Sequence, residues 1–285
     1  MIVVERPEGS YSGYKNKIVS FTNGEISLGA SVKTSNNYEE QNNLVLLHGS
    51  GGLGSDTKLW ERVGLDLGYK VITIDHFTGR GIEKLLYDGS KEKPMSFFEV
   101  YDDFLCFSQA HSKIFDNVST SVVGFSMGGA AAMLLNSDDY EKVFALYPLV
   151  LPFMKEFEAV DGRGLKCFFG ASDNWTKPEA LEMLNSRREE GGPILSQRFE
   201  DSYHSFSKPC TSAKFKVLDL LAEDSDIYNV KNREEFSSIY KNQYSSSRNI
   251  ELKDTKIEFS FEATKEVLSQ FFDEDVDLES YLQIL

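Results

Sequence analysis

The hexapeptide G-F-S-M-G-G at residues 124–129 constrains the fold of this chain more than any other segment. It joins an apolar run at residues 119–125, typical of a buried strand, to an alanine-rich run at residues 130–135 that predicts a packed helix. A serine at such a junction sits on a sharp turn with its hydroxyl exposed above the sheet edge, and glycines two positions away avoid clashes in that turn. The segment therefore predicts that Ser126 is a nucleophile, the alternative being a glycine-rich helix start with a capping serine.

The base that activates this serine must come from elsewhere in the chain. A serine nucleophile needs a group that takes its proton and a third group that orients the base. Where the serine stands at a strand-to-helix turn, the order along the chain is serine, then aspartate or glutamate, then histidine. His204 is the only one of the four histidines that follows Ser126, and it comes just after a strand-like run at residues 194–200. We therefore predict His204 as the base, the alternative being an ordinary surface or core histidine.

The orienting acid is expected at the carboxyl end of a strand, because open parallel sheets place their functional groups there. Asp173 follows a short apolar run at residues 164–170 and stands in the loop A-S-D-N-W. Asp161 precedes that run and would lie at the wrong end of the sheet, and Asp201 is close enough to His204 to be a turn residue. We predict Asp173 as the acid, with a solvated loop aspartate as the alternative.

Acyl transfer also needs an oxyanion hole of backbone N–H groups. One donor is expected to be the amide of Met127, the residue after the nucleophile. The apolar run at residues 44–47 predicts a strand, and the H-G-S-G-G loop that follows lets main chain approach a ligand closely. We predict the amide of Ser50 or Gly51 as the second donor. His48 is a candidate for the substrate site, although we expect it to hold the shape of the loop.

Five ordered blocks of the sequence resemble the α/β-hydrolases and, within them, the dienelactone hydrolase family. The blocks are L-V-L-L-H-G-S-G-G (44–52), G-Y-K-V-I-T-I-D-H-F-T-G-R-G-I (68–82), G-F-S-M-G-G (124–129), G-A-S-D-N-W-T (170–176) and Y-H-S-F (203–206). By this resemblance Ser126, Asp173 and His204 match the family's triad positions. It implies an α/β-hydrolase fold, with a mostly parallel central sheet and helices on both faces.

Two departures from the family pattern bear on the substrate. The best-studied dienelactone hydrolases have a cysteine nucleophile and a glutamate near the oxyanion loop, whereas this chain has Ser126 and no carboxylate at residues 48–50. The family binds its substrate's carboxylate with basic side chains, for which Arg80 and Lys208 are the corresponding candidates. A loop-pinning ion pair for Arg80 and a solvated surface position for Lys208 are the alternatives. His76, directly after the strand-like run of the second block, is expected to be a loop histidine bonded to backbone rather than a pocket residue.

Composition narrows the class of protein. A chain of 285 residues suits one α/β domain, and its net charge of −15 argues against binding nucleic acid or anionic membrane surfaces. The three cysteines have no paired spacing, which predicts reduced thiols and a cytoplasmic protein. No C-x-x-C or H-E-x-x-H pattern indicates a metal site, and no cofactor is expected. We expect neither a signal peptide nor a membrane span, and a homodimer stays open.

The alternation of patterns predicts the order of elements. An antiparallel hairpin is expected at residues 17–21 and 25–32, around Asn23-Gly24. Further strands are expected at residues 44–47, 70–75, 119–125, 142–149, 165–169 and 194–200. Helices are expected at residues 58–67, 96–115, 130–135, 177–190 and 262–272, and residues 214–221 are helix-compatible.

The segment after His204 is longer than a minimal hydrolase requires. We predict one domain over residues 1–285, in which residues 209–256 form either an insertion that covers the pocket or a surface excursion. Residues 244–253 are expected to form a loop, and residues 257–285 the final helix with an acidic tail that frays or docks elsewhere on the molecule.

These patterns together predict a serine hydrolase that cleaves an ester or lactone of a small molecule through an acyl-enzyme, with the option that the substrate carries a carboxylate. A peptidase or an acyltransferase would use the same groups. A binding module without catalysis is the alternative from another class, because hydrolase scaffolds host many functions.

Overall fold

An eight-stranded sheet forms the centre of the protein in a computed structural model that describes residues 13–37, 41–83, 85, 95–151, 164–186, 194–218, 230, 232–245 and 252–285. The strand order is β1-β2-β4-β3-β5-β6-β7-β8. The strands are β1 (Tyr14–Asn23), β2 (Ile26–Ser35), β3 (Asn43–Leu47), β4 (Lys70–Asp75), β5 (Thr120–Phe125), β6 (Val143–Leu146), β7 (Leu165–Gly170) and β8 (Leu195–Phe199). The β1–β2 and β2–β4 pairs are antiparallel and the others parallel, which confirms the predicted sheet with its N-terminal hairpin.

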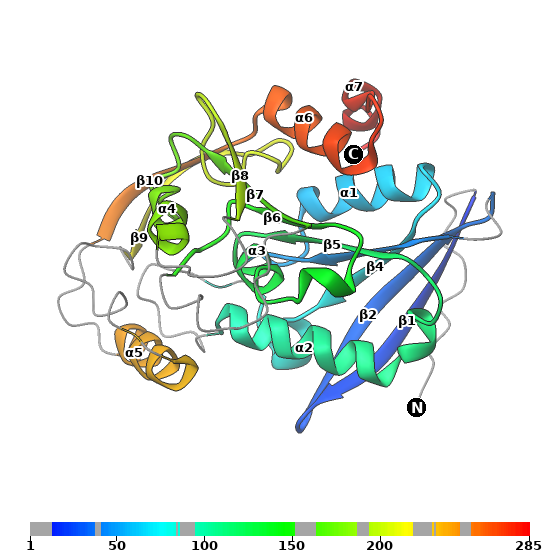
Figure 1. Cartoon of the computed structure of the whole chain (residues 1–285), viewed down its shortest axis with the longest axis horizontal. Helices are drawn as coiled ribbons and strands as arrows, with labels where there is room; N and C mark the ends of the chain where they lie inside the picture. Colours follow the sequence, from blue (N-terminus) through cyan, green and yellow to red (C-terminus); the bar gives the residue numbers. More distant parts are fainter. Residues whose placement is uncertain are drawn as a thin grey trace.

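Helices cover both faces of this sheet (Figure 1). Helices α1 (Ser55–Asp66) and α6 (Phe261–Phe272) pack on one face, and α2 (Phe97–Ala110), α3 (Met127–Ala132) and α4 (Glu179–Ser186) pack on the other. The strand β3 shows why both faces are covered. Leu44 and Leu46 belong to the core cluster on the α1 side, and Val45 and Leu47 to the cluster on the α2 side. Because successive side chains of a strand point to opposite faces, this run of apolar residues requires cover on both.

Most predicted elements are present with shifted ends. The strand predicted over residues 142–149 ends at Leu146, because Tyr147 has a φ of 40° and turns the chain away from the sheet. The helix predicted over residues 96–115 ends at Ala110, after which a short 3₁₀ turn covers Ser112–Ile114. Two more 3₁₀ turns lie at Thr78–Arg80 and Ser137–Asp139. Residues 187–190, at the end of the predicted helix 177–190, lie outside the described residues.

The C-terminal excursion differs from the prediction. The prediction that residues 214–221 suit a helix is wrong for residues 214–218, because β9 (Ser212–Leu218) pairs antiparallel with β10 (Leu252–Glu258) in a second sheet. Residues 219–221 lie outside the described residues. In S-A-K-F-K-V-L apolar residues alternate with lysines, the period of a strand rather than of a helix. Between these strands lies α5 (Arg233–Ser245).

The predicted loop over residues 244–253 is also only partly correct. Its first residues end α5 and its last residues begin β10, while residues 246–251 lie outside the described part of the chain.

The chain does not end its ordered structure with α6. A short helix, α7 (Leu278–Leu282), follows, and Val276 and Leu278 are buried against the cluster on the α1 side. The acidic tail therefore docks on the molecule, which is one of the two predicted outcomes. Among the helices of the described residues, none has the length and apolar character needed to cross a membrane.

Candidate active site

Ser126 lies on a strained turn between β5 and α3. Its backbone has φ 52° and ψ −109°, a region that residues other than glycine rarely adopt. A Cβ on Gly124 would come within 2.1 Å of the Gly128 carbonyl oxygen, and a Cβ on Gly128 within 2.1 Å of the Leu47 carbonyl oxygen. Since neither contact is possible, both positions require glycine, as the motif predicts. The turn holds the serine hydroxyl beyond the end of the strand.

The three residues predicted as a triad meet at this edge of the sheet. Ser126 Oγ lies 3.0 Å from His204 Nε2, and His204 Nδ1 lies 2.8 Å from Asp173 Oδ2. The side chains of His204 and Asp173 are 1% and 0% exposed. When Nδ1–H donates to the carboxylate, Nε2 is left as the acceptor for the serine hydroxyl. The arrangement can therefore transfer a proton from the serine to the imidazole.

Asp173 is fixed by neutral donors from its own loop. Its Oδ1 accepts bonds from the backbone N–H groups of Trp175 at 2.8 Å and of Thr176 at 3.1 Å, and its Oδ2 accepts one from Thr176 Oγ1 at 2.7 Å. Burial would raise the pKa of Asp173, but the charge and hydrogen bond of His204 and the bonds from Thr176 hold it below its ordinary value. The carboxylate therefore stays charged beside the imidazole.

Two aromatic rings enclose His204. Its ring centroid lies 4.9 Å from that of Tyr147 and 4.6 Å from that of Trp175. Tyr147 is buried, and its hydroxyl is 2.8 Å from Ser207 Oγ. The sequence analysis predicted a role for neither ring. Trp175 could have been found from its place two residues after the predicted acid in the A-S-D-N-W loop. Nothing in the sequence around Tyr147 indicates that its ring lies beside His204.

The candidate oxyanion loop lies directly against the nucleophile turn. A Cβ on Gly49 would be 2.9 Å from the Phe125 carbonyl oxygen and 3.2 Å from Ser126 Cβ. The Gly52 N–H donates to the Gly49 carbonyl at 3.0 Å, which makes a turn with Ser50 and Gly51 at its corner. The geometry keeps the amides of both Ser50 and Gly51 as candidates. Met127 is the first residue of α3, so its N–H belongs to the donors of a helix N-terminus.

His48 is fully buried and holds this loop. Its Nδ1–H donates to the Gly49 carbonyl at 2.8 Å, and its Nε2 accepts the backbone N–H of His76 at 3.1 Å. Burial and the neighbouring His76 lower the pKa of His48 to about 3, so the ring is neutral. Both ring nitrogens are thus used by backbone groups, which agrees with the expectation that His48 shapes the loop rather than the alternative that it binds substrate.

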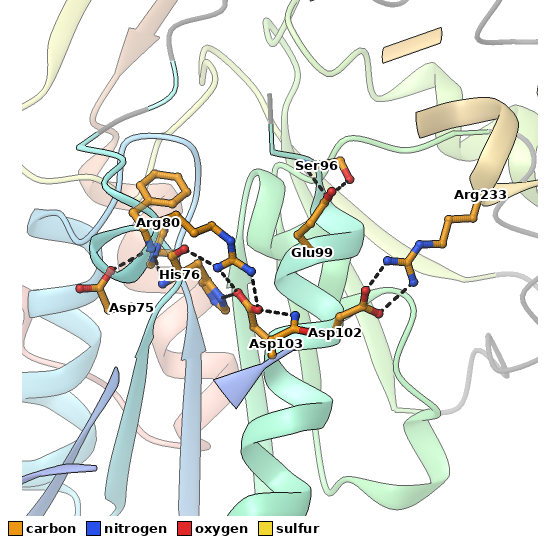
Figure 2. A network of polar contacts seen from close by, with 11 residues as sticks. Asp75, His76, Arg80, Ser96, Glu99, Asp102, Asp103 and Arg233 are labelled. Carbon is orange, nitrogen blue, oxygen red and sulfur yellow. Dashed lines mark hydrogen bonds and ion pairs between the residues drawn. The ribbon is translucent and has the colours of Figure 1, made fainter. Parts of the chain in front are cut away.

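Arg80 forms an ion pair behind the loop. Its Nη2 donates to Asp103 Oδ1 at 2.7 Å, and its Nη1 donates to Asp103 Oδ2 at 2.8 Å and to the His76 carbonyl at 2.6 Å (Figure 2). His76 Nδ1 lies 2.9 Å from the same carboxylate, and Asn23 Nδ2 donates to it at 2.8 Å. The structure thus gives Arg80 the ion pair that the sequence left as an alternative, and it places His76 in a side-chain network instead of the expected backbone bond.

Lys208 lies beside the oxyanion loop. A Cβ on Gly51 or on Gly54 would be 3.3 Å from its Nζ, and the side chain is half-buried. Burial raises the pKa of the nearby Asp56, although the charge of Lys208 acts in the opposite direction. Lys208 is therefore neither freely solvated nor placed in the pocket next to the serine.

A small pocket of about 30 Å³ opens next to Ser126. Its described wall is mostly apolar, from Phe97, Met127, Leu149, Trp175 and Tyr240, with hydroxyl groups from Ser96, Ser126 and Thr176. The candidate substrate residues Arg80, Lys208 and His48 are not part of this described wall. Tyr240, on α5, is a pocket residue that the sequence analysis missed.

The described residues contain no group of three or more histidine, cysteine, aspartate or glutamate side chains that could hold a metal ion. The three cysteines are unpaired: Cys167 is buried, Cys106 is half-buried and Cys210 is exposed.

Comparison with known proteins identifies the fold. The sequence matches no protein-family model and no curated protein. The structure is similar to a dienelactone hydrolase-like promiscuous phosphotriesterase, P91, from metagenomic libraries, with a TM-score of 0.61 and 14% identity, over 95% of this chain and 99% of that one. It is also similar to a protein assigned as a dienelactone hydrolase from Klebsiella pneumoniae subsp. pneumoniae, with a TM-score of 0.54 and 12% identity, over 68% of this chain and 89% of that one. The α/β-hydrolase fold and the resemblance to dienelactone hydrolases are thereby confirmed at the level of the fold.

Proposed function

We propose that the protein is a serine hydrolase of the dienelactone hydrolase type that cleaves an ester or lactone through an acyl-enzyme. The observation that carries the proposal is the continuous hydrogen-bonded path from Ser126 through His204 to Asp173, at the end of a strained turn. A serine kept only as a helix cap would need neither partner. The similarity to dienelactone hydrolase-like structures supports the same chemistry.

The geometry accounts for each step. His204 Nε2 takes the proton of Ser126 Oγ as the oxygen attacks the carbonyl carbon, and Asp173 stabilises the imidazolium that forms. The amides of Met127 and of Ser50 or Gly51 hold the oxyanion of the tetrahedral intermediate. His204 then gives the proton to the leaving alcohol, which breaks the ester bond and leaves an acyl group on Ser126. Water, with His204 again as base, cleaves the acyl-enzyme to the acid.

The proposal does not include a carboxylate on the substrate. Arg80 is paired with Asp103, and the described wall of the pocket beside Ser126 carries apolar and hydroxyl side chains. A substrate carboxylate in that pocket would lose its hydration without gaining a cation, which is costly. An uncharged ester fits the described wall better.

The test is hydrolysis of esters, lactones and peptide anilides by the wild type, by Ser126→Ala and by Ser27→Ala, which removes an exposed serine on β2. We expect ester turnover in the wild type and in Ser27→Ala, and a loss of about 10⁴–10⁶-fold in Ser126→Ala, because triad members act as a unit. Turnover that survives in Ser126→Ala would refute the proposal.

The remaining alternatives have their own outcomes in the same assay. Preferred anilide cleavage would indicate a peptidase, and a product with an added alcohol in place of water would indicate an acyltransferase. A folded protein that hydrolyses none of the panel and forms no fluorophosphonate adduct would indicate a binding module.

A further inference from the structure

One wall of the pocket beside Ser126 comes from outside the central sheet and its connections. Tyr240 lies on α5, which comes between β9 and β10 in the sequence. The other described wall residues belong to α2 or α3, to the N-caps of these helices, or to the loops after β6 and β7. The residue is 4% exposed, and its hydroxyl donates to the Met95 carbonyl at 3.1 Å. The tyrosine ring is therefore a fixed part of the pocket.

An aromatic cluster joins this ring to α2. The Phe236 ring lies 5.2 Å from Tyr240 with an angle of 26° between the planes, and it lies 5.3 Å from Phe97 and 5.6 Å from Phe98. Phe236 is fully buried, and Phe97 lines the pocket as Tyr240 does. A displacement of α5 would break these contacts and open the pocket at the same place.

An ion pair fixes the start of α5 to the same helix. Arg233 Nη1 donates to Asp102 Oδ1 at 2.9 Å, Nη2 donates to Asp102 Oδ2, and the guanidinium carbon is 4.9 Å from the centroid of the Phe98 ring (Figure 2). A bidentate pair stacked on an aromatic ring is a specific geometry that lysine would not reproduce. The excursion is thus docked at two points along α2.

The pocket that results is small. A cavity needs roughly 10–15 Å³ to hold one water molecule, so the volume of about 30 Å³ fits two groups of that size. Its apolar wall suits methyl and methylene groups, and Ser126 lies at its edge.

We propose that Tyr240 is a specificity-determining residue that limits the substrate to esters with a short, uncharged acyl chain. The inference rests on the proposed function, because it assumes that Ser126 receives the acyl group. In this view α5 is the part of the protein that selects the acyl length, and the framework around Ser126 supplies the chemistry.

The test measures kcat/KM for p-nitrophenyl acetate, butyrate, hexanoate and octanoate in the wild type, Tyr240→Ala and Tyr240→Phe. The matched control is Ser238→Ala, at an exposed position of α5. Each further methylene that an apolar pocket accepts contributes roughly fourfold. We expect the hexanoate-to-acetate ratio to rise at least about tenfold in Tyr240→Ala, where room for several methylenes opens. The ratio should stay at the wild-type value in Tyr240→Phe, which keeps the ring, and in Ser238→Ala.

A second variant and a second readout separate the possible failures. Arg233→Met removes the ion pair without touching the pocket, and we expect it to raise the ratio in the same direction by a smaller factor. If Tyr240→Ala does not fold, Tyr240→Leu takes its place, with thermal unfolding as the check.

An intact-mass adduct with a fluorophosphonate reports the serine independently of the acyl length. An adduct on Ser126 with an unchanged ratio in the Tyr240 truncation would overturn this inference alone. Neither an adduct nor turnover in the wild type would overturn the proposed function, and this inference with it. A wild type that prefers octanoate to acetate would also overturn the inference.

Discussion

The described residues contain two buried histidine–aspartate pairs, and they differ in whether the histidine contacts a serine hydroxyl. The nitrogen-to-oxygen distances are 2.8 Å in His204–Asp173 and 2.9 Å in His76–Asp103, and all four side chains are at most 1% exposed. The two pairs differ in the contact that the second ring nitrogen, Nε2, makes. His204 Nε2 faces the Ser126 hydroxyl, whereas His76 Nε2 is buried with no hydrogen-bond partner among the residues that the structure describes.

The charges around the two aspartates differ as well. Asp103 is bound by the Arg80 guanidinium, so its negative charge is already neutralised in the ground state (Figure 2). The other donors to Asp173 in its own loop are neutral N–H and O–H groups, which leaves its charge for an imidazolium at His204. The two pairs have nearly the same nitrogen-to-oxygen distance and burial, so these two quantities alone do not mark a buried histidine–aspartate pair as a candidate catalytic one. Access to a nucleophile and an uncompensated carboxylate distinguish the site.

The largest expected effect comes from substituting each aspartate by asparagine. Asp173→Asn should lower kcat by about 10⁴-fold with little change in stability, because the amide favours the wrong tautomer of His204. Asp103→Asn should leave kcat within about tenfold of the wild type but destabilise the fold, because Arg80 loses its buried partner. Ester turnover and denaturant unfolding of both variants are the measurements. Equal losses of kcat in the two variants would contradict the distinction.

A second way to break the comparison is to remove the arginine. Arg80→Met leaves Asp103 buried with less compensation, and breaking such a pair costs about 3–5 kcal/mol. Because Arg80 has a structural role here, kcat/KM should change equally for neutral and carboxylate-bearing esters. A loss confined to the carboxylate-bearing esters would show that Arg80 binds the substrate carboxylate, and it would contradict a purely structural role.

The pH dependence of stability tests the burial of His48, the histidine that bonds to the backbone of Gly49 and His76. His48 binds a proton below about pH 6.5 in the unfolded chain but only near pH 3 in the folded one, so the unfolded state gains protons first. Its contribution therefore lowers stability as the pH falls from 6.5 to 3, by up to about 1.4 kcal/mol per pH unit.

The matched variant for this measurement is His48→Asn. The difference in unfolding free energy between the wild type and this variant should shrink as the pH falls through that window. Parallel curves for the two proteins would show that His48 is not buried as a neutral ring.

The smallest effects come from removing one neutral side-chain donor to each aspartate. Thr176→Val removes a hydroxyl bond to Asp173 and should lower kcat by less than about tenfold, because the backbone donors to Asp173 and its bond to His204 remain. The lost bond to a charged group, about 1.5–3 kcal/mol, should fall on stability instead. Asn23→Ala removes a bond to Asp103 and should lower stability by a similar energy without affecting kcat. A loss of turnover in Asn23→Ala as large as that in Thr176→Val would contradict the distinction between the two pairs.

Local sequence predicted the parts of the site that obey local rules. The glycines around Ser126 are required by contacts within a few residues or with the neighbouring strand. The chain-order rule picked out His204, and the place of Asp173 after a strand-like run picked out the acid, both without any knowledge of distance. The central strands of the sheet were also predictable, because each of them is a short apolar run in the sequence.

The rest depends on contacts between distant segments. Arg80 finds Asp103 only because α2 packs beside the turn after β4, and Tyr240 reaches the pocket only because α5 docks on α2. A short window of sequence carries no information on such partners. The strand β9 is a different case, because its apolar residues alternate with lysines and the local pattern already had the period of a strand.

The most direct test of the central claim is intact-mass labelling with a fluorophosphonate in the wild type, His204→Ala and His76→Gln, with thermal unfolding as the check on folding. The serine oxygen displaces fluoride from phosphorus, so the adduct reports whether Ser126 is activated. We expect one adduct on the wild type and on His76→Gln, mapped to Ser126, and labelling at least about 100-fold slower in His204→Ala. Labelling that depends equally on both histidines, or on neither, would contradict that claim.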